Sequence, residues 1–328
     1  MDNKQHKNLE KVYNYVASHT ISNIAKLADS LSLPHNEILP LISELKLMGL
    51  DIRMESNQIQ SSSQLDIIDI GFIKEHTKYS KNSRVISKEI VFEFITQSTN
   101  QLAQENNKDT IYISDFQSQG KGRQAKKWLT AVGQSIAISI SHRFDFGLKE
   151  LSGLNIVVGV AIIQSLKQFG GKDMGLKWPN DIISPKGKIA GILIEASGNN
   201  KSCRAIIGIG INWNIRQALF KSIEQPCNNA GISCVSRTQF IVALILNLNT
   251  ILKEFTENKL QNIQSLWHQN DAYINEKINI VQGDIIKPAT YKGIDKKGLL
   301  KVEIKNKLKT VASGEVSIRK TSLHSSTA

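Results

Sequence analysis

Apolar side chains recur at helical spacing through the first part of the chain. Intervals of three and four residues over 9–16, 24–31 and 38–47 predict three short helices, each with one buried face. Ser22 is a candidate N-cap for the second helix, and the break before the third falls at Pro34. Three short helices with a tight turn between the second and third follow the plan of a helix-turn-helix unit.

This unit is expected to end in a hairpin and a linker. Residues 50–59 suit a small hairpin, and the polar, serine-rich stretch that follows predicts a linker near 60–66. We therefore expect a winged helix-turn-helix domain over residues 1–65.

Strand and helix patterns alternate from about residue 67 to 270. Apolar runs predict strands at 90–95 and 110–114, and the alternation over 135–140 predicts a half-buried strand. Further strands are expected at 175–178, 189–195 and 205–211, and helices at 99–106, 151–169, 240–252 and 260–270. This order favours an α+β domain over residues 66–272, with an antiparallel or mixed sheet and helices on one side.

The end of the chain changes to short strands separated by turns. They are expected at 277–281, 285–291, 299–304, 309–313 and 315–318. So many short strands close together are typical of a small closed barrel of SH3-like type, which we assign to residues 273–328.

Composition narrows the class of protein. The 328 residues are 41% hydrophobic and 21% charged, which suits globular domains with a sizeable core and excludes disorder over the whole chain. The longest apolar runs are shorter than the roughly 20 residues that span a bilayer, and the polar N-terminus lacks the apolar segment of a secretory signal. The three cysteines are too few and too far apart for a disulfide framework or a zinc ribbon. We expect a cytoplasmic protein with no membrane partner.

The net charge of +12 suggests nucleic-acid binding, but its distribution changes that view. Residues 1–60 hold six Lys or Arg against seven Asp or Glu, residues 61–270 hold 24 against 16, and residues 271–328 hold 11 against 6. The helix-turn-helix segment is thus the only negative one. The positive excess lies in the central and C-terminal regions.

Two parts of the central region carry candidate chemistry. A loop from Gly120 to Trp128 alternates glycine with cations, so that backbone N–H groups and positive charges can approach an anion. It matches neither a Walker loop nor a dinucleotide fingerprint, and its composition alone favours a solvated basic loop. The second part is Lys177-Trp178-Pro179-Asn180-Asp181, followed by Gly187-Lys188-Ile189-Ala190-Gly191 and by Gly208-Ile209-Gly210-Ile211-Asn212. Taken singly, these patterns also suit a turn, an edge-strand lysine and a glycine-containing strand.

The order and spacing of these motifs, together with the helix start Ser98-Thr99-Asn100, resemble the biotin–protein ligases. With the helix-turn-helix start and the terminal barrel, nearly the whole chain resembles the bifunctional members that also repress a biotin operon. The resemblance implies a class II synthetase-like ligase domain and biotin–[acetyl-CoA-carboxylase] ligase activity. Biotin and ATP would form biotinyl-5′-AMP, and a lysine of a biotin carboxyl carrier protein would accept the biotin.

The resemblance also implies roles for individual residues. Biotin contacts fall at Ser98, Thr99, Asn100, Gln117, Lys121, Gly122, Arg123 and Lys188. Nucleotide contacts fall at Gly120, Lys177, Trp178, Asn180 and Asn212, and Mg²⁺ would meet Asp181. Lys188, Arg123 and Lys121 are the catalytic cations, which would screen the repulsion between the biotin carboxylate and the α-phosphate. Trp128 and Trp178 are candidate flat walls of the pocket, although core packing suits Trp128 equally well.

The sequence departs from the family pattern in two places. The loop has Lys121 where the family has arginine and Ala125 where it has a flexible glycine; we still expect activity. The expected recognition helix has no Lys or Arg before Lys46 and contains Pro40, and the hairpin lacks a basic Gly-Lys-Gly tip. We therefore expect binding to operator DNA to be weak or lost.

Two other functions compete with the ligase interpretation. One is a repressor that uses biotinyl-AMP mainly as a corepressor, and the poor base-contacting chemistry of residues 34–46 argues against it. The other is a lipoate–protein ligase, which shares the catalytic fold; the glycine-cation loop and the terminal barrel favour biotin. Because family members dimerise through sheet edges, we expect a homodimer on binding biotinyl-AMP.

Overall fold

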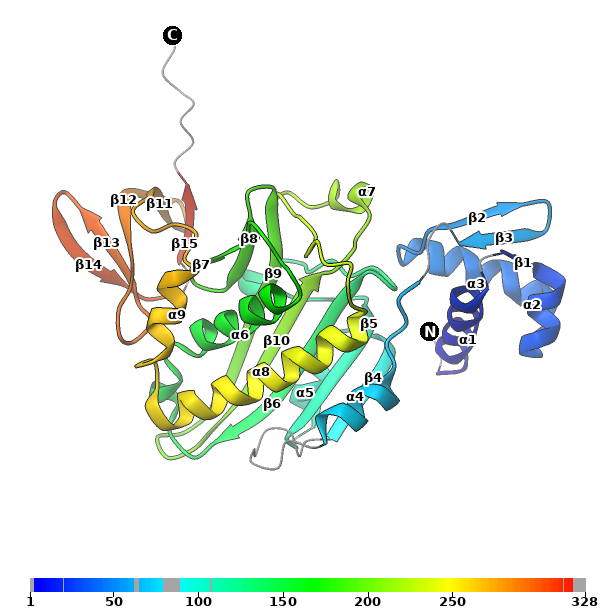
Figure 1. Ribbon diagram of the computed structural model, residues 1–328, viewed down its shortest axis with the longest axis horizontal. Helices are drawn as coiled ribbons and strands as arrows, with labels where there is room; N and C mark the ends of the chain where they lie inside the picture. Colours follow the sequence, from blue (N-terminus) through cyan, green and yellow to red (C-terminus); the bar gives the residue numbers. More distant parts are fainter. Residues whose placement is uncertain are drawn as a thin grey trace, which may run out of the picture.

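The computed structural model describes residues 3–19, 21–61, 65–78, 89–106, 108–314 and 316–320. Figure 1 shows three parts in a row: a small unit of helices and strands at the N-terminus, a large sheet covered by helices, and a β domain at the other end.

The N-terminal unit contains the three helices and the hairpin predicted from the apolar spacing. The helices are α1 (Asn3–Ser18), α2 (Ile24–Leu31) and α3 (His35–Leu47), and the strands are β1 (Ile21–Asn23), β2 (Ile52–Glu55) and β3 (Gln58–Ser61). The strands pair antiparallel in the order β1-β3-β2. The N-cap of α2 is Asn23, whose Oδ1 accepts from the Ala25 amide (2.9 Å), so the assignment of Ser22 was wrong. Helix α3 continues through Pro40.

The central part is built on one seven-stranded sheet in the order β4-β5-β6-β10-β9-β8-β7. Its strands are β4 (Glu89–Thr96), β5 (Thr110–Gln117), β6 (Ser135–Phe144), β7 (Gly175–Lys177), β8 (Asp181–Ser184), β9 (Gly187–Gly198) and β10 (Cys203–Asn212). The neighbours β4 and β5 run parallel and the other neighbours run antiparallel. The sheet is therefore mixed, as expected.

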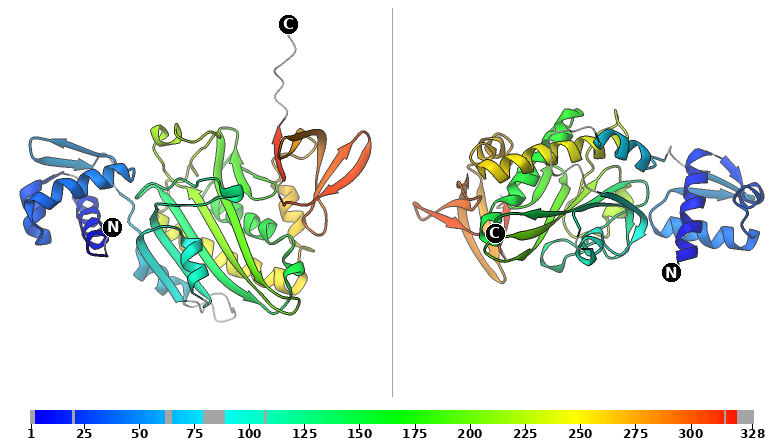
Figure 2. Two further views of the ribbon diagram at one scale, coloured as in Figure 1. Left: turned by 180° about the vertical axis from the view of Figure 1, so that it is seen from behind. Right: turned by 90° about the horizontal axis from the view of Figure 1, so that it is seen from below.

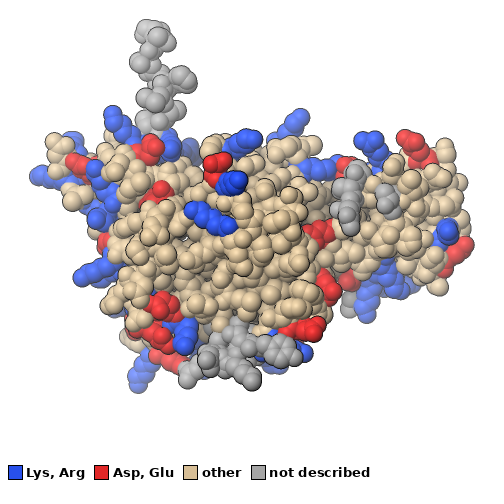
Figure 3. Space-filling view, in the orientation of Figure 1, with Lys and Arg blue, Asp and Glu red and all other residues tan. Residues whose placement is uncertain are grey.

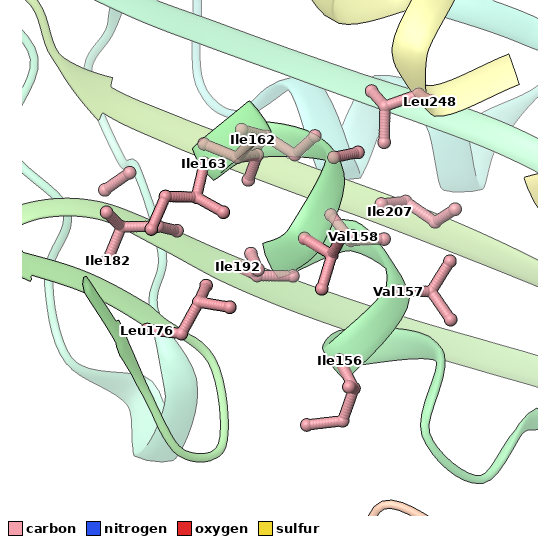
Figure 4. Packing of buried hydrophobic residues seen from close by; sticks show 14 of the residues in the cluster. Ile156, Val157, Val158, Ile162, Ile163, Leu176, Ile182, Ile192, Ile207 and Leu248 are labelled. Carbon is pink, nitrogen blue, oxygen red and sulfur yellow. The ribbon is translucent and has the colours of Figure 1, made fainter. Parts of the chain in front are cut away.

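The two long helices cover one face of this sheet. They are α6 (Leu154–Gln168) and α8 (Arg237–Asn258), and Figure 2 shows the sheet from behind with both on its far side. Ile192 and Ile207 of the sheet meet Val158 of α6, while Leu248 of α8 packs on the other side of that helix (Figure 4). Because α6 packs against the sheet on one side and against α8 on another, it is apolar on nearly all sides.

The shorter helices connect and flank the sheet. They are α4 (Ile70–Thr77), α5 (Thr99–Glu105), α7 (Gln217–Phe220) and α9 (Ile263–Gln269), with 3₁₀ turns η1 (Arg123–Ala125) and η2 (Leu148–Leu151). Among the described residues, one helical stretch, Leu148–Gln168, is long and apolar enough to cross a membrane, with a mean hydropathy of 1.2. Since 61% of its apolar window is buried inside the protein, it has the character of a core helix.

Two details of the sheet differ from the sequence prediction. The four-residue strand β8 was not predicted. Strand β6 is buried on both faces rather than half-buried, since α5 packs over the face that carries Ser139. Its alternating serines therefore point at protein and not at water.

The C-terminal part is a small antiparallel β domain. Its strands are β11 (Lys277–Gln282), β12 (Ile285–Ile294), β13 (Leu300–Ile304), β14 (Lys307–Val311) and β15 (Val316–Lys320). They pair in the order β14-β13-β12-β11-β15, which leaves β14 and β15 at opposite ends of the ladder within the described residues. The five strands were predicted, but their pairing is open and not a closed barrel; Glu315, with which the fifth strand was expected to begin, lies outside the described residues.

The N-terminal unit and the central part share an apolar core, and Tyr13 of the N-terminal unit reaches a buried ion pair of the central part. Phe94 and Val132 of the central part pack into the apolar cluster of the N-terminal helices. Arg237, fully buried, donates to Asp115 (2.9 Å) and reaches the hydroxyl of Tyr13 in α1 (3.5 Å). Burial alone would lower the pKa of Arg237, but Asp115 and its neighbours more than offset this and raise it. Of the expected linker, residues 62–64 lie outside the described residues, and Asp66 is held by the Arg237 amide (2.6 Å).

Candidate active site

The predicted site residues meet in one cavity. It lies on the face of the sheet opposite α6: Ile192 and Ile207 point at α6, so the adjacent Gly191 and Gly208 face the cavity. The cavity is lined by Ser98, Thr99, Asn100, Gln117, Lys121, Gly122, Arg123, Trp128, Asn180, Lys188, Gly191, Ile192, Leu193, Gly208, Ile209 and Gly210. Five predicted site residues do not line the cavity: Gly120, Lys177, Trp178, Asp181 and Asn212.

One end of the cavity is a neutral hydrogen-bonding cluster. The Thr99 amide, at the first residue of α5, donates to Oε1 of Gln117 at the end of β5 (2.8 Å), so the Gln117 NH₂ group points away from α5. Ser139 of β6 donates to Thr99 Oγ1 (2.7 Å) and Asn100 Oδ1 (2.6 Å). Asn100 in turn donates to Glu195 (2.7 Å). Because these polar side chains are satisfied by neutral partners and one carboxylate, the cluster suits a neutral polar ligand group.

The floor of the cavity is made by glycines of β9 and β10. A Cβ on Gly208 would lie 2.2 Å from Asn100 Oδ1, and one on Gly210 would lie 2.3 Å from the Trp128 ring. The alternate glycines therefore clear one face of this strand. The cleared space is taken by Asn100 and Trp128 of the protein itself.

Trp128 fills most of the cavity. Its ring lies over Gly210 and Gly191, and its indole Nε1 is buried with no hydrogen-bond partner among the described residues. The space that remains is about 40 Å³, enough for roughly three water molecules. A ligand larger than this requires part of the lining to move, for example Trp128 or the loop that precedes it.

A cation stands beside the Trp128 ring. Lys188, near the start of β9, places its Nζ 5.3 Å from the ring centroid of Trp128 and 2.7 Å from Asp181 Oδ1. Its backbone is fixed on both sides, because its carbonyl accepts from the Asn212 side chain (3.0 Å) and its amide donates to Pro226 (2.8 Å). Asn212 thus holds the strand that carries Lys188 and does not line the cavity.

Asp181 is a carboxylate that lies next to the cavity without lining it. It faces Lys177 across the β7–β8 pair. Burial lowers the pKa of Lys177, and Asp181 opposes that shift. One carboxylate therefore compensates two partly buried lysines.

The glycine-cation loop closes over the cavity by backbone bonds. The Trp128 amide donates to Gly120 (2.8 Å) and the Gly122 amide donates to Lys126 (2.7 Å). At Gly120 a Cβ would lie 2.5 Å from the Trp128 carbonyl, so no other residue fits there. Ala125 has φ +56°, the left-handed conformation that the family glycine would adopt without strain.

Arg123 connects this loop to two other parts of the protein. It donates to Asn180 (3.3 Å) and to the carbonyls of Ser313 (2.5 Å) and Gly314 (2.6 Å) in the C-terminal β domain. Burial lowers the pKa of Arg123, and Asp181 opposes the shift. The β domain therefore borders the cavity.

Trp178 corrects one prediction. Its ring is 1% exposed, and its Nε1 donates to the Gly298 carbonyl in the C-terminal domain (3.1 Å). Trp178 therefore joins the central part to the C-terminal domain and does not form a wall of the pocket. Trp128 forms that wall.

The described side chains do not form a metal site on their own. Among the described residues, no group of three or more His, Cys, Asp or Glu side chains converges on a point. Asp181 offers one carboxylate, which suffices where Mg²⁺ arrives on nucleotide phosphates but not for a metal held by protein alone.

Sequence reasoning missed two residues of the neutral cluster, Ser139 and Glu195, as site residues. Ser139 was interpreted as part of the polar face of a half-buried strand, and Glu195 only as the last residue of a predicted strand. Both are recognised as site residues once α5 is placed, because Asn100 of α5 forms a hydrogen bond with each of them.

Comparisons with known proteins agree on the central and C-terminal parts. Residues 91–212 match a family described as "Biotin/lipoate A/B protein ligase family", and residues 273–319 match "Biotin protein ligase C terminal domain". The chain is 31% identical over 211 residues to "Bifunctional ligase/repressor BirA" of Escherichia coli, an alignment that covers 63% of this chain and 65% of that protein. The protein of the same name from Bacillus spizizenii is 26% identical over 328 residues, covering 95% of this chain and 98% of its own length.

The fold also matches a solved structure. "Biotin protein ligase from Aquifex aeolicus in complex with biotin and ATP" superposes with a TM-score of 0.58 at 24% identity, over 71% of this chain and 100% of that one. The likeness shows a shared fold over that part of the chain.

Proposed function

Because the chain belongs to the biotin/lipoate protein ligase family and carries the biotin protein ligase C-terminal domain, we propose that it is a biotin–protein ligase. It joins biotin to ATP as biotinyl-5′-AMP with release of pyrophosphate, and then transfers biotin to a lysine of a biotin carboxyl carrier protein with release of AMP.

The observation that carries this proposal is the composition of the cavity beside Trp128. The neutral cluster of Thr99, Asn100 and Gln117 suits a ring with amide-like groups, and Lys188 suits a carboxylate. Biotin has a ureido ring at one end and a carboxylate at the other. We assign ring contacts to Ser98, Thr99, Asn100 and Gln117, and carboxylate contacts to Lys188 and to Lys121, Gly122 and Arg123 of the loop.

The chemistry of the first step is largely electrostatic. The biotin carboxylate attacks the α-phosphorus, so two anions meet; Lys188, Arg123 and Lys121 offset that repulsion. Lys188 is ion-paired with Asp181 at 2.7 Å and exchanges this partner for the substrate carboxylate. In the second step Lys188 polarises the acyl carbonyl while the acceptor amine attacks it and AMP leaves.

The nucleotide and its metal are assigned around the same strands. Asn180 is the one predicted nucleotide residue that lines the cavity, and Gly120 and Lys177 support the loop and strand beside it. Bound Mg²⁺ would neutralise phosphate charge, and Asp181 is the carboxylate that would meet it.

Mass spectrometry of an acceptor domain tests the proposal. The domain is incubated with the chain, ATP, Mg²⁺ and biotin, and we expect the mass of one biotinyl group on one lysine. Lys188→Ala serves as the matched inactive variant. Transfer of lipoate in preference to biotin, when both acids are supplied together, would establish the lipoate alternative, and transfer of neither would end the ligase proposal.

For the N-terminal unit we propose a winged helix-turn-helix domain over residues 1–65, before a ligase domain over 66–272 and an SH3-like domain over 273–328. The order of α1, α2, α3 and the β2–β3 hairpin supports it. A repressor function toward operator DNA is the second candidate, supported by the names of the relatives. The few cations on α3 make us propose that this binding is weak.

We also propose that the ligase forms a homodimer when biotinyl-AMP is bound, and that it works in the cytoplasm. In β9, residues 187–191 pair with β8, whereas residues 193–198 pair only with β10 among the described residues. That open edge suits pairing with a second copy of the chain.

A further inference from the structure

Asn100 connects the cavity to strand β9. Its Nδ2 donates to Glu195 Oε2 (2.7 Å), and its Oδ1 accepts from Ser139 Oγ (2.6 Å). Asn100 is 6% exposed and Ser139 fully buried, whereas Glu195 is half-buried. The NH₂ group and the oxygen of the Asn100 side chain therefore each have a hydrogen-bond partner within the protein.

The carboxylate of Glu195 decides which way this carboxamide faces. The two ends of a carboxamide have nearly the same shape, so packing alone does not fix its orientation. An ionised carboxylate accepts hydrogen bonds and donates none, so the NH₂ end of Asn100 must face Glu195. The oxygen of Asn100 then faces the Ser139 hydroxyl, which lies 2.6 Å from it.

Glu195 has no competing ionic partner. No Lys, Arg or His of the described residues lies within 4.0 Å of its carboxylate, and on β9 it stands opposite Ile206 of β10. The Glu195 carboxylate therefore accepts a charge-assisted hydrogen bond from Asn100 and forms no ion pair among the described residues.

We propose that Glu195 is a positioning residue for the acid substrate. It orients Asn100, and through Asn100 it sets the donors and acceptors that the cavity presents to the ring of the substrate. This inference rests on the proposed ligase function and deepens it, since an ordered polar wall favours a ureido ring over the apolar ring of lipoate.

Two substitutions at one position separate orientation from packing. Glu195→Leu keeps the size and removes the acceptor, so Asn100 can rotate; we expect the KM for biotin to rise about tenfold while the KM for ATP stays within about twofold. Glu195→Gln restores an acceptor oxygen without the charge and should recover most of the biotin affinity. The preference for biotin over lipoate in kcat/KM should fall in the same order.

A double-mutant cycle tests whether the effect passes through Asn100. In an Asn100→Ala background, Glu195→Leu should add less than about a twofold further rise in the KM for biotin. Glu257→Leu, an exposed carboxylate on α8, is the matched control and should leave both KM values unchanged.

The inference is overturned if Glu195→Leu leaves the biotin KM unchanged, or if its effect is equally large with and without Asn100. The same holds if Glu195→Gln is as impaired as Glu195→Leu. A wild-type chain that activates no biotin would instead overturn the proposed function, and this is seen before any variant is compared.

Discussion

Ala125 shows at the scale of one residue how this loop differs from its family pattern. It has φ +56°, and the preceding Gln124 has the same value. A side chain in the left-handed region costs about 1–2 kcal/mol, because Cβ approaches the carbonyl oxygen. The alanine therefore keeps the glycine conformation at the expense of local strain.

Ala125→Gly should relieve this strain. Glycine removes the clash, but it also gives the unfolded chain about 0.4–1 kcal/mol more conformational freedom. The net change should be a stabilisation of up to about 1 kcal/mol, measured by urea unfolding. Ala196→Gly, on an exposed stretch of β9 without positive φ, is the control and should destabilise. Equal destabilisation by both changes would contradict the strain at Ala125.

Strand β10 shows at the scale of an element why the site could be located but not fully described from sequence. The alternate glycines and the motif spacing placed Gly208, Gly210, Lys188 and the loop near one another, and the structure brings them together. The burial of Ser139 could not be found in the same way, since a serine alternating with isoleucine is also the pattern of a water-facing strand. Only the packing of α5 on β6 distinguishes the two.

The same strand explains the place of Trp128, which rests on Gly210 where any side chain would collide with it. Because the remaining space is about 40 Å³, we expect the lining around Trp128 to rearrange when biotin binds. We therefore predict that saturating biotin changes the intrinsic tryptophan fluorescence.

Substitution identifies the tryptophan responsible. Trp128→Phe should remove most of the fluorescence change, while Trp213→Phe, buried against Phe240 on the helix side, should preserve it. A biotin-dependent change of full size in Trp128→Phe would show that the indole does not move.

At the scale of the whole molecule, the N-terminal unit is fixed to the ligase part by more than a chain connection. Sequence patterns predicted both units but not the contact between them. Tyr13, Asp115 and Arg237 are each more than a hundred residues apart in the chain, so no local periodicity connects them. The pair of Asp51 with Arg216 (2.9 Å) crosses this junction and is more exposed than the pair of Asp115 with Arg237, which lies within the ligase part and is reached by Tyr13.

Loss of the buried pair and loss of the exposed pair should lower the free energy of unfolding by very different amounts. Asp115→Asn leaves the fully buried Arg237 without its counter-charge, and such losses cost about 3–5 kcal/mol. Asp51→Asn is the comparison variant, in the exposed pair that crosses the junction: both partners are more than one third exposed, so a loss below about 1 kcal/mol is expected. Urea unfolding measures both, and equal losses would contradict this account of the junction.

The charge of the whole molecule bears on the last prediction. Figure 3 shows Lys and Arg gathered at the end formed by the C-terminal strands, while the N-terminal end carries both signs. On α3, the exposed positions 35, 36, 39, 40, 43, 46 and 47 include one lysine, Lys46, and the apolar Leu39 and Leu47. Operator binding gains much of its affinity from phosphate neutralisation, which this face supplies poorly.

We therefore predict that the chain, with biotin and ATP present, binds the promoter of its own biotin genes no better than a scrambled duplex. Fluorescence anisotropy at physiological salt should give Kd values in the range of about 10⁻⁶–10⁻⁴ M for both, as for non-specific binding. The pair Leu39→Arg and Leu47→Lys adds two cations to α3; if that face meets DNA, the double variant should bind both duplexes more tightly and with a steeper salt dependence. Leu148→Lys and Leu308→Lys, which add the same charge on exposed positions of the other domains, control for net charge alone. Nanomolar binding to the promoter with strong preference over the scrambled duplex would overturn the prediction and restore the repressor function to this chain.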